Sequence, residues 1–252
     1  MLSQVTGLTL SLAPMPHAPH LRFSGAEARA EAVVLLLHGG TPDSFASVRA
    51  FDSAVLRMIP FGRGVVRAGN GRIALATLRY AVRGWNGENE SPLQDARWAL
   101  DRIAERFGDL PVGLVGHSMG GRVALRLADY VGVNSGGVNS VGERSREEHS
   151  GGVHSVAALA PWLPPGELFP PLDDRALLLV HGTADRMTDP RATSELAEKL
   201  AAEGGDVELV KYPGARHHML FPHRPWHDLV DRFMVRTLLT PAPGGPTARQ
   251  RH

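Results

Sequence analysis

The amino-acid sequence predicts an α/β fold, in which a mostly parallel, twisted β-sheet carries helices on both faces. Two observations support this prediction. Short apolar runs recur along the chain, each followed by a glycine, a histidine or a turn-forming residue, and they cover residues 33–37, 73–78, 112–115 and 176–180. Longer stretches with helical spacing separate these runs. Strands that alternate with helices in this way build a parallel sheet that is buried on both faces.

The helices are marked by one apolar face and by local start signals. An apolar residue at every third or fourth position places one side of the stretch 93–107 against a core. Just before it, Ser91 followed by a proline fits a helix N-cap, and Asp189 followed by a proline repeats this pattern. The run Val207–Tyr212 then indicates a last strand, and residues 226–239 indicate a closing helix.

We predict a single domain over residues 1–240. The chain has 252 residues, and a chain of this size can bury roughly three quarters of the surface that it exposes when unfolded. Residues 133–153 are glycine-rich and polar and contain a local duplication, so we expect a flexible surface loop there. A lid over a binding site is the alternative for this loop. The tail of residues 241–252 is rich in proline and glycine and is expected to be disordered.

Composition and charge exclude several classes of function. With 27 basic and 26 acidic residues the formal net charge is +1, so no strong field would attract nucleic acid or an anionic membrane. The absence of cysteine rules out disulfides, thiolate metal sites and a cysteine nucleophile. No apolar run reaches the roughly 18 residues of a membrane span, and the N-terminal segment does not resemble a signal peptide. We therefore expect a cytoplasmic protein whose partner is a small molecule.

The strongest chemical motif follows the strand of residues 112–115. That strand runs into GHSMG, residues 116–120, and a helical pattern comes next. A hydroxyl presented by a sharp strand-to-helix turn crowds the positions two residues before and after it, so glycine is needed at both. The helix directs its positive end toward the group that reacts. Ser118 is therefore predicted to be a catalytic nucleophile, with His117 as a packing residue.

A serine hydroxyl also needs a base within hydrogen-bond reach and a carboxylate that orients the base. Asp185 lies just beyond the strand of residues 176–180, at the carboxyl edge of the sheet, where sites form. It is the predicted acid. Its rivals are Asp173 and Asp174, which precede the strand, and Asp189, which better fits a helix cap.

The base is expected in the turn after the last strand. Residues 213–219 read PGARHHM and contain two adjacent histidines. His217 is the predicted base, because the residue next to a base usually packs or points outward, and His218 is the alternative.

Backbone N–H groups complete the predicted site. The strand of residues 33–37 leads into His38, Gly39 and Gly40, and a glycine just past a strand lets the backbone approach a substrate. The predicted oxyanion donors are the N–H groups of Gly40 and Met119. His38 is expected to support this loop and not to transfer protons.

The order of Ser118, Asp185 and His217, with HGG after an early strand and GHSMGG at the turn, resembles the α/β-hydrolase superfamily. The resemblance extends from about residue 33 to residue 239. It implies an α/β-hydrolase fold with a mostly parallel sheet of about eight strands, and it implies no cofactor and no metal.

Two further expectations follow from this resemblance. The first, antiparallel strands are expected in residues 5–12 and 20–23. A cap domain, where the superfamily carries one, usually follows the strand after the elbow helix, here residues 156–160; only residues 161–175 separate that strand from the next. No cap domain fits in this interval.

The expected function is that of a serine hydrolase, which cleaves a small carboxylic ester or related acyl compound through an acyl-enzyme intermediate. One alternative is aminopeptidase-like or dipeptidyl-hydrolase-like amide hydrolysis, in which Glu88 or Glu90 would hold a substrate amine. A non-catalytic binding protein with this fold is a less favoured alternative. Some apolar residues are candidates for lining the pocket, although a core role is commoner for such residues; they are Trp85, Trp162, Leu163 and Phe169.

Overall fold

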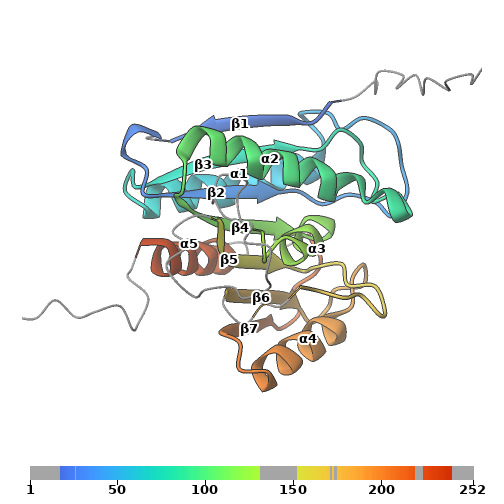
Figure 1. The fold of residues 1–252 in the computed structure, drawn as a ribbon. Coiled ribbons are helices and arrows are strands. Elements are labelled where there is room, and N and C mark those ends of the chain that lie inside the picture. Colours follow the sequence, from blue (N-terminus) through green and yellow to red (C-terminus); the bar gives the residue numbers. More distant parts are fainter. Residues whose placement is uncertain are drawn as a thin grey trace, which may run out of the picture.

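The computed structural model describes residues 18–25, 27–130, 152–170, 172, 175–218 and 224–239. Within these ranges seven strands form one sheet in the order β1-β3-β2-β4-β5-β6-β7 (Figure 1). Strand β1 pairs antiparallel with β3, as predicted for residues 20–23, and the other neighbours are parallel. The strands are β1 His20–Ser24, β2 Ala32–Leu37, β3 Ile73–Arg79, β4 Pro111–His117, β5 Gly152–Leu159, β6 Ala176–Gly182 and β7 Val207–Tyr212.

Helices cover both faces of the sheet, which confirms the predicted fold class. Helices α1 and α5 pack on one face, and α2, α3 and α4 pack on the other (Figure 1). The helices are α1 Ser53–Ala68, α2 Ser91–Phe107, α3 Met119–Arg126, α4 Pro190–Ala202 and α5 Arg224–Leu239. None of the described helices is both long and apolar enough to cross a membrane.

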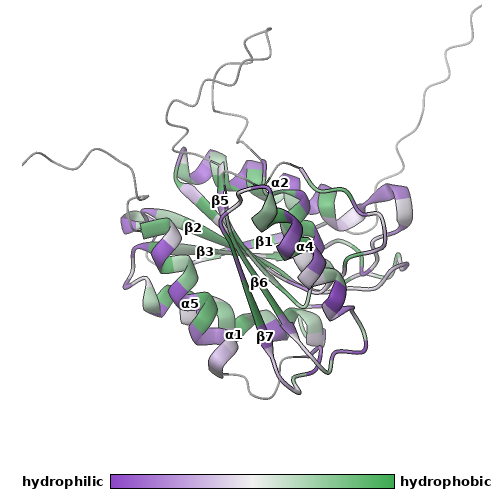
Figure 2. Ribbon diagram, turned by 90° about the horizontal axis from the view of Figure 1, so that it is seen from below, coloured by the Kyte–Doolittle hydropathy of each residue, from purple (hydrophilic) through white to green (hydrophobic). Residues whose placement is uncertain are grey.

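Strand β2 shows why the central strands are apolar without alternation. All six of its residues are buried. Val33 and Leu35 pack toward α2 and α3, whereas Val34 and Leu36 pack toward α1 and α5. A strand covered on both faces must be apolar at every position, and Figure 2 accordingly shows hydrophobic strands between the two helix layers.

Helix α1 has no counterpart among the predicted elements. It contains Pro60 in its interior, and a proline there removes one helical hydrogen bond and opposes the helix locally. Packing holds the helix in place, because Met58, Phe61 and Val65 are buried against the sheet. Tertiary contacts thus outweigh the local signal.

The two predicted helix caps had different outcomes. Asp189 caps α4 as expected, since its carboxylate accepts a hydrogen bond from the Arg191 N–H at 2.8 Å. Ser91 does not cap α2; the cap position is Glu90, and Ser91 is the first helical residue. The Ser91 hydroxyl instead accepts a hydrogen bond from Asn86 at 3.2 Å, so a contact outside the helix occupies it.

No cap domain is inserted between β5 and β6, as predicted, because the described residues of that interval form no helix or strand. The boundary of the predicted loop at 133–153 is wrong by two residues, since β5 begins at Gly152 and pairs there with β4. The remainder of that loop, the predicted strand at residues 5–12, the tail of 241–252, and Asp173 and Asp174 lie outside the described residues.

Candidate active site

The turn between β4 and α3 has the geometry predicted for a nucleophile elbow. Ser118 adopts φ 57° and ψ −118°, a strained conformation for a residue with a side chain. A Cβ atom on Gly116 would lie 2.1 Å from the Gly120 oxygen, and one on Gly120 would lie 2.2 Å from the Leu37 oxygen. Only glycine fits at either position, and the hydroxyl of Ser118 is left at the carboxyl edge of the sheet.

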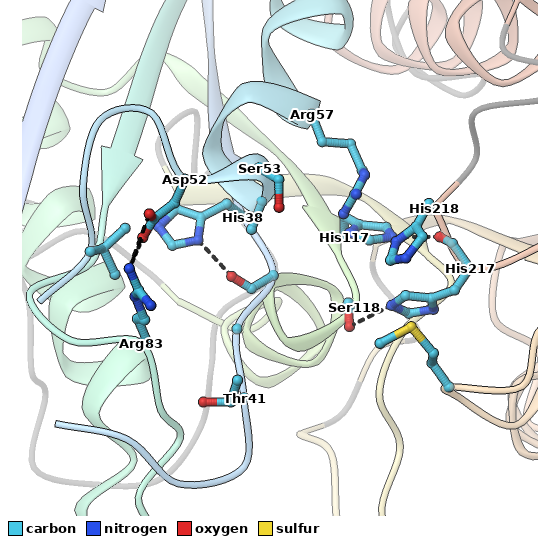
Figure 3. Close-up of a pocket in the computed structure, with 15 residues that line it drawn as sticks. His38, Thr41, Asp52, Ser53, Arg57, Arg83, His117, Ser118, His217 and His218 are labelled. Atoms are coloured by element: carbon cyan, nitrogen blue, oxygen red, sulfur yellow. Dashed lines mark hydrogen bonds and ion pairs between the residues drawn. The ribbon is translucent and has the colours of Figure 1, made fainter. Parts of the chain in front are cut away.

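Three side chains that are distant in the sequence meet at this edge. His217 follows β7 and its Nε2 lies 3.0 Å from Ser118 Oγ (Figure 3). Its Nδ1 lies 2.7 Å from Oδ2 of Asp185, which follows β6. Because a carboxylate only accepts, Nδ1 carries the proton and Nε2 is free to accept the Ser118 hydroxyl proton. The structure therefore brings together the predicted nucleophile, base and acid in a continuous chain of hydrogen bonds.

Of the two adjacent histidines, only His217 reaches the serine. His218 is exposed, and its ring centroid lies 5.7 Å from that of His217. It lines the same pocket without a hydrogen bond to Ser118 among the described contacts. The alternative base therefore lies at the site but not in position to accept the proton.

Asp185 is held as an anion by several donors. Burial on its own would raise the pKa of this carboxyl, but hydrogen bonds from His181 and His217 and from the N–H groups of Met187 and Thr188 outweigh burial and keep the pKa well below its usual range. The two N–H groups lie 2.8 and 3.1 Å from Oδ1. Asp185 is therefore negatively charged at neutral pH.

Thr188 and His181 support this acid, and the sequence reading missed both. The Thr188 hydroxyl lies 2.9 Å from Asp185 Oδ2 and 3.1 Å from His217 Nδ1. His181 Nε2 lies 3.2 Å from the same carboxylate oxygen, and its Nδ1 lies 2.7 Å from Thr193 Oγ1. Their proximity to Asp185 in the sequence could have suggested both residues, since His181 lies near the end of β6 and Thr188 lies three residues beyond Asp185.

His117 has a positioning role beyond the packing role that was predicted. Its Nε2 donates to the backbone carbonyl of His217 at 2.9 Å, which ties the histidine loop to the end of β4. Burial lowers the pKa of His117 well below its usual value, and the neighbouring His217 adds to this effect. His117 is therefore neutral and holds the loop without exchanging protons.

His38 supports the loop after β2, as predicted. Its Nδ1 donates to the Gly39 carbonyl at 2.7 Å, and its Nε2 accepts from the Tyr80 N–H at 3.2 Å. Burial lowers the pKa of His38 to about 4. Both ring nitrogens are occupied, so this histidine is not available as a base.

The two predicted oxyanion donors belong to residues near the serine. Met119 begins α3, and Gly40 lines the pocket that contains Ser118. A Cβ atom on Gly40 would lie 2.3 Å from the Arg83 oxygen and 2.4 Å from Met119 Cε, so only glycine brings the backbone this close. Within the described ranges, neither N–H donates to another group of the protein.

The pocket beside Ser118 has a volume of about 280 Å³ and is lined mainly by the segments after β2 and at the start of α1. The aromatic residues suggested as lining do not reach it. Trp85 and Trp162 instead pack on the Arg122 guanidinium, with ring centroids 3.5 and 4.8 Å from its Cζ. Leu163 and Phe169 likewise pack against the core.

Neither acidic residue suggested for amine binding lies at this pocket. Glu90 forms an ion pair with Arg126 at 2.9 Å, and Glu88 is exposed. In the described part of the chain, no group of three or more His, Cys, Asp and Glu side chains is arranged to hold a metal ion.

Two family models match the sequence. Residues 34–173 match the alpha/beta hydrolase family, and residues 153–239 match the prolyl oligopeptidase family. No curated protein matches the chain.

Solved structures share the fold at low sequence identity. A putative alpha/beta hydrolase from Agrobacterium tumefaciens is 16% identical, with a TM-score of 0.61 over 87% of this chain and 91% of that one. A serine hydrolase without a lid from Xanthomonas campestris is also 16% identical, with a TM-score of 0.60 over 90% and 91%. A propionate-bound thermophilic esterase from Thermogutta terrifontis is 16% identical, with a TM-score of 0.60 over 89% and 96%. Likeness at this level shows the fold, and the chemistry must be inferred from the residues of the site.

Proposed function

The chain belongs to the alpha/beta hydrolase family, whose model matches more than half of it, and on this premise we propose that it is a serine hydrolase that cleaves small carboxylic esters. One observation carries the proposal: His217 lies within hydrogen-bond reach of both Ser118 and Asp185, at 3.0 and 2.7 Å. This arrangement converts an inert hydroxyl into a nucleophile.

In the proposed reaction the Ser118 hydroxyl attacks the ester carbonyl while His217 Nε2 takes its proton. The tetrahedral intermediate collapses when His217 returns that proton to the leaving alcohol, and an acyl-enzyme remains. Water then attacks the acyl group with the same base, which releases the carboxylic acid and regenerates Ser118. Asp185 stabilises the imidazolium in both steps, and its low pKa supports this role.

The developing oxyanion would be bound by the N–H groups of Gly40 and Met119. These N–H groups have no protein acceptor among the described residues, and the Met119 N–H lies at the positive end of α3. Preorganised donors of this kind are worth about 100- to 1000-fold in kcat each.

Small substrates are favoured by the size of the pocket, about 280 Å³, because pockets for larger ligands reach roughly 1000 Å³. The likeness to a propionate-bound esterase is consistent with a short acyl group.

A second candidate, hydrolysis of an amide or peptide bond, is favoured by the match of residues 153–239 to the prolyl oligopeptidase family. The same serine, histidine and acid would perform it. We rank it second because the acidic residues suggested for binding an amine lie away from the pocket.

Covalent labelling with a fluorophosphonate probe, followed by peptide mapping, tests the assignment of the nucleophile. We expect the label on Ser118 and no labelling of Ser118→Ala, with kcat reduced by about 10⁴-fold or more in that variant. Rates on p-nitrophenyl acetate and butyrate, compared with aminoacyl p-nitroanilides, rank the two candidates. Clear preference for the anilides would reverse the ranking, and esterase activity in Ser118→Ala would reject the site.

A further inference from the structure

The pocket beside Ser118 carries a positive charge for which the described residues offer no acidic partner. Three of its lining side chains have a permanent charge: Arg57 and Arg83 are cations and Asp52 is an anion. The remaining titratable lining groups are histidines, of which His38 and His117 are held neutral by burial. Leaving His217 and His218 aside, the side chains that line the pocket therefore have a net formal charge of +1.

Arg83 and Asp52 neutralise each other. Arg83 Nη2 lies 3.0 Å from one Asp52 carboxylate oxygen and 3.1 Å from the other. The carboxylate also accepts from the Arg49 N–H at 3.1 Å. This pair is satisfied internally, so the excess charge belongs to Arg57.

Arg57 is half-buried and has no hydrogen bond or ion pair among the described residues. Its Nε atom is fully covered and lacks an acceptor, and burial lowers the pKa of Arg57 without any carboxylate that offsets it. A guanidinium has five N–H donors and stays protonated in proteins. The terminal nitrogens of Arg57, unlike Nε, are not among the covered atoms, so an anion that enters the pocket can accept charge-assisted hydrogen bonds from them.

The side chain points into the site. It projects from α1 toward His117 and His218, across the pocket from Asp52 and Arg83 and on the side where Ser118 and His217 lie (Figure 3). Burial is the main cause of the lowered pKa values of His117 and His218, and the charge of Arg57 contributes to both. The charge of Arg57 thus affects the electrostatic potential at the end of the pocket where the scissile bond would lie.

We propose that Arg57 binds a carboxylate of the substrate, so that the enzyme prefers small esters that carry a second, ionised carboxyl group. This inference rests on the proposed serine hydrolase function and names its substrate class. The carboxylate can belong to the acyl part, as in the half-ester of a short dicarboxylic acid, or to the alcohol part, as in the ester of a hydroxy acid. Both present the same anion to the guanidinium.

The test compares matched charged and neutral esters by the release of acid at constant pH. Monoethyl glutarate against ethyl butyrate examines the acyl side, and acetoxyacetate against ethyl acetate examines the alcohol side. We expect the wild type to prefer the charged member of one pair in kcat/KM. Arg57→Gln should lower that charged-to-neutral ratio by about 10- to 100-fold, the usual effect of losing a hydrogen bond to a charged group, and Arg57→Lys should restore part of it.

Arg63→Gln is the matched control, because Arg63 is an exposed residue of the same helix that does not line the pocket. It should leave the ratio unchanged. Added salt should reduce the wild-type preference. An equal loss on both esters in Arg57→Gln, or no preference for a charged ester in the wild type, would overturn the inference.

The affinity for glutarate, measured by calorimetry, tests the anion site independently of ester hydrolysis. The wild type should bind glutarate at least about tenfold more tightly than Arg57→Gln, whether or not any ester is cleaved. If neutral esters are cleaved and glutarate binding is the same in both proteins, Arg57 is not an anion site but the hydrolase assignment stands. If glutarate binding depends on Arg57 and no ester is cleaved, the hydrolase assignment fails and the anion site stands.

Discussion

Two buried carboxylates in this molecule have nearly the same exposure and opposite properties. Asp185, at the carboxyl edge of the sheet, is 8% exposed, and Asp231, between α5 and α1, is 6% exposed. Hydrogen bonds hold the pKa of Asp185 far below its usual range despite its burial, whereas burial raises the pKa of Asp231 to about 6. Burial alone therefore does not decide the charge of a carboxyl group.

The difference lies in the number of donors. Asp185 accepts from two backbone N–H groups, two histidines and the Thr188 hydroxyl. Asp231 has one carboxylate oxygen without any partner, and its other oxygen lies 3.7 Å from the exposed Arg67. A buried anion is stable only where donors replace water. The arrangement around Asp185 thus marks a site, and the arrangement around Asp231 marks a pH-dependent weakness of the fold.

Removing the charge at Asp185 should have the largest effect. Asp185→Asn would place an amide against His217 Nδ1 and favour the wrong tautomer of the imidazole. We expect kcat/KM to fall by about 10⁴-fold, as for the equivalent change in a serine protease triad. Steady-state kinetics on p-nitrophenyl butyrate measure this, with Asp231→Asn as the control, which should stay within about twofold of the wild type, as a change away from the site. A comparable loss in both variants would contradict a specific role of Asp185 in the reaction.

Removing one donor from Asp185 should have an intermediate effect. Thr188→Val deletes the hydroxyl that contacts Asp185 Oδ2, and with it a second contact to the Ala160 carbonyl at 3.3 Å. A reduction of kcat by about tenfold is expected, the range for one hydrogen bond to a charged group. Thr188→Ser retains the hydroxyl and should recover most of the activity. If Thr188→Ser is as impaired as Thr188→Val, loss of the hydroxyl alone does not explain the effect.

At the second carboxylate the expected change is in stability. The folded-state pKa of Asp231 is raised to about 6, above its unfolded value near 4, so its ionisation weakens the fold as pH rises from about 4 to about 6. Asp231→Asn should increase the free energy of unfolding by about 1–2 kcal/mol at pH 8. The gain should disappear near pH 3, where the carboxyl is largely protonated in both the folded and the unfolded wild type. Urea denaturation at the two pH values checks this, and an equal gain at both would implicate packing.

The smallest expected effect is the acid dependence of Asp185 itself. Its folded-state pKa is lowered, so its contribution to stability is complete above the unfolded pKa near 4 and is lost as pH falls toward the folded value. Between pH 5 and pH 3 the wild type should therefore lose about 1 kcal/mol more stability than Asp185→Asn. Parallel urea titrations of both proteins over this interval measure the difference, and identical slopes would contradict the lowered pKa.

The turn that presents Ser118 could be predicted from the sequence because its requirements are local. A strand, two glycines at fixed spacing and a helix define the turn around Ser118. Each glycine is required because a Cβ atom at its position would lie 2.1 or 2.2 Å from a backbone oxygen. Asp185 and His217 followed from their position after the last two strands. The sequence favoured His217 and left His218 as an alternative, and the coordinates show that it is His217 Nε2 that lies within hydrogen-bond distance of Ser118 Oγ.

The apolar runs, their order and the spacing of GHSMG were sufficient to determine the parallel sheet, its edge and the serine presented there, since these depend on neighbours in the chain. Only the tertiary structure showed that Thr188 and His117 contact the His217 segment, because these partners follow different strands. It alone also separated Arg83, which is paired with Asp52, from Arg57, which has no partner in the described residues. An ion pair depends on distances in space, and spacing along the chain does not specify them.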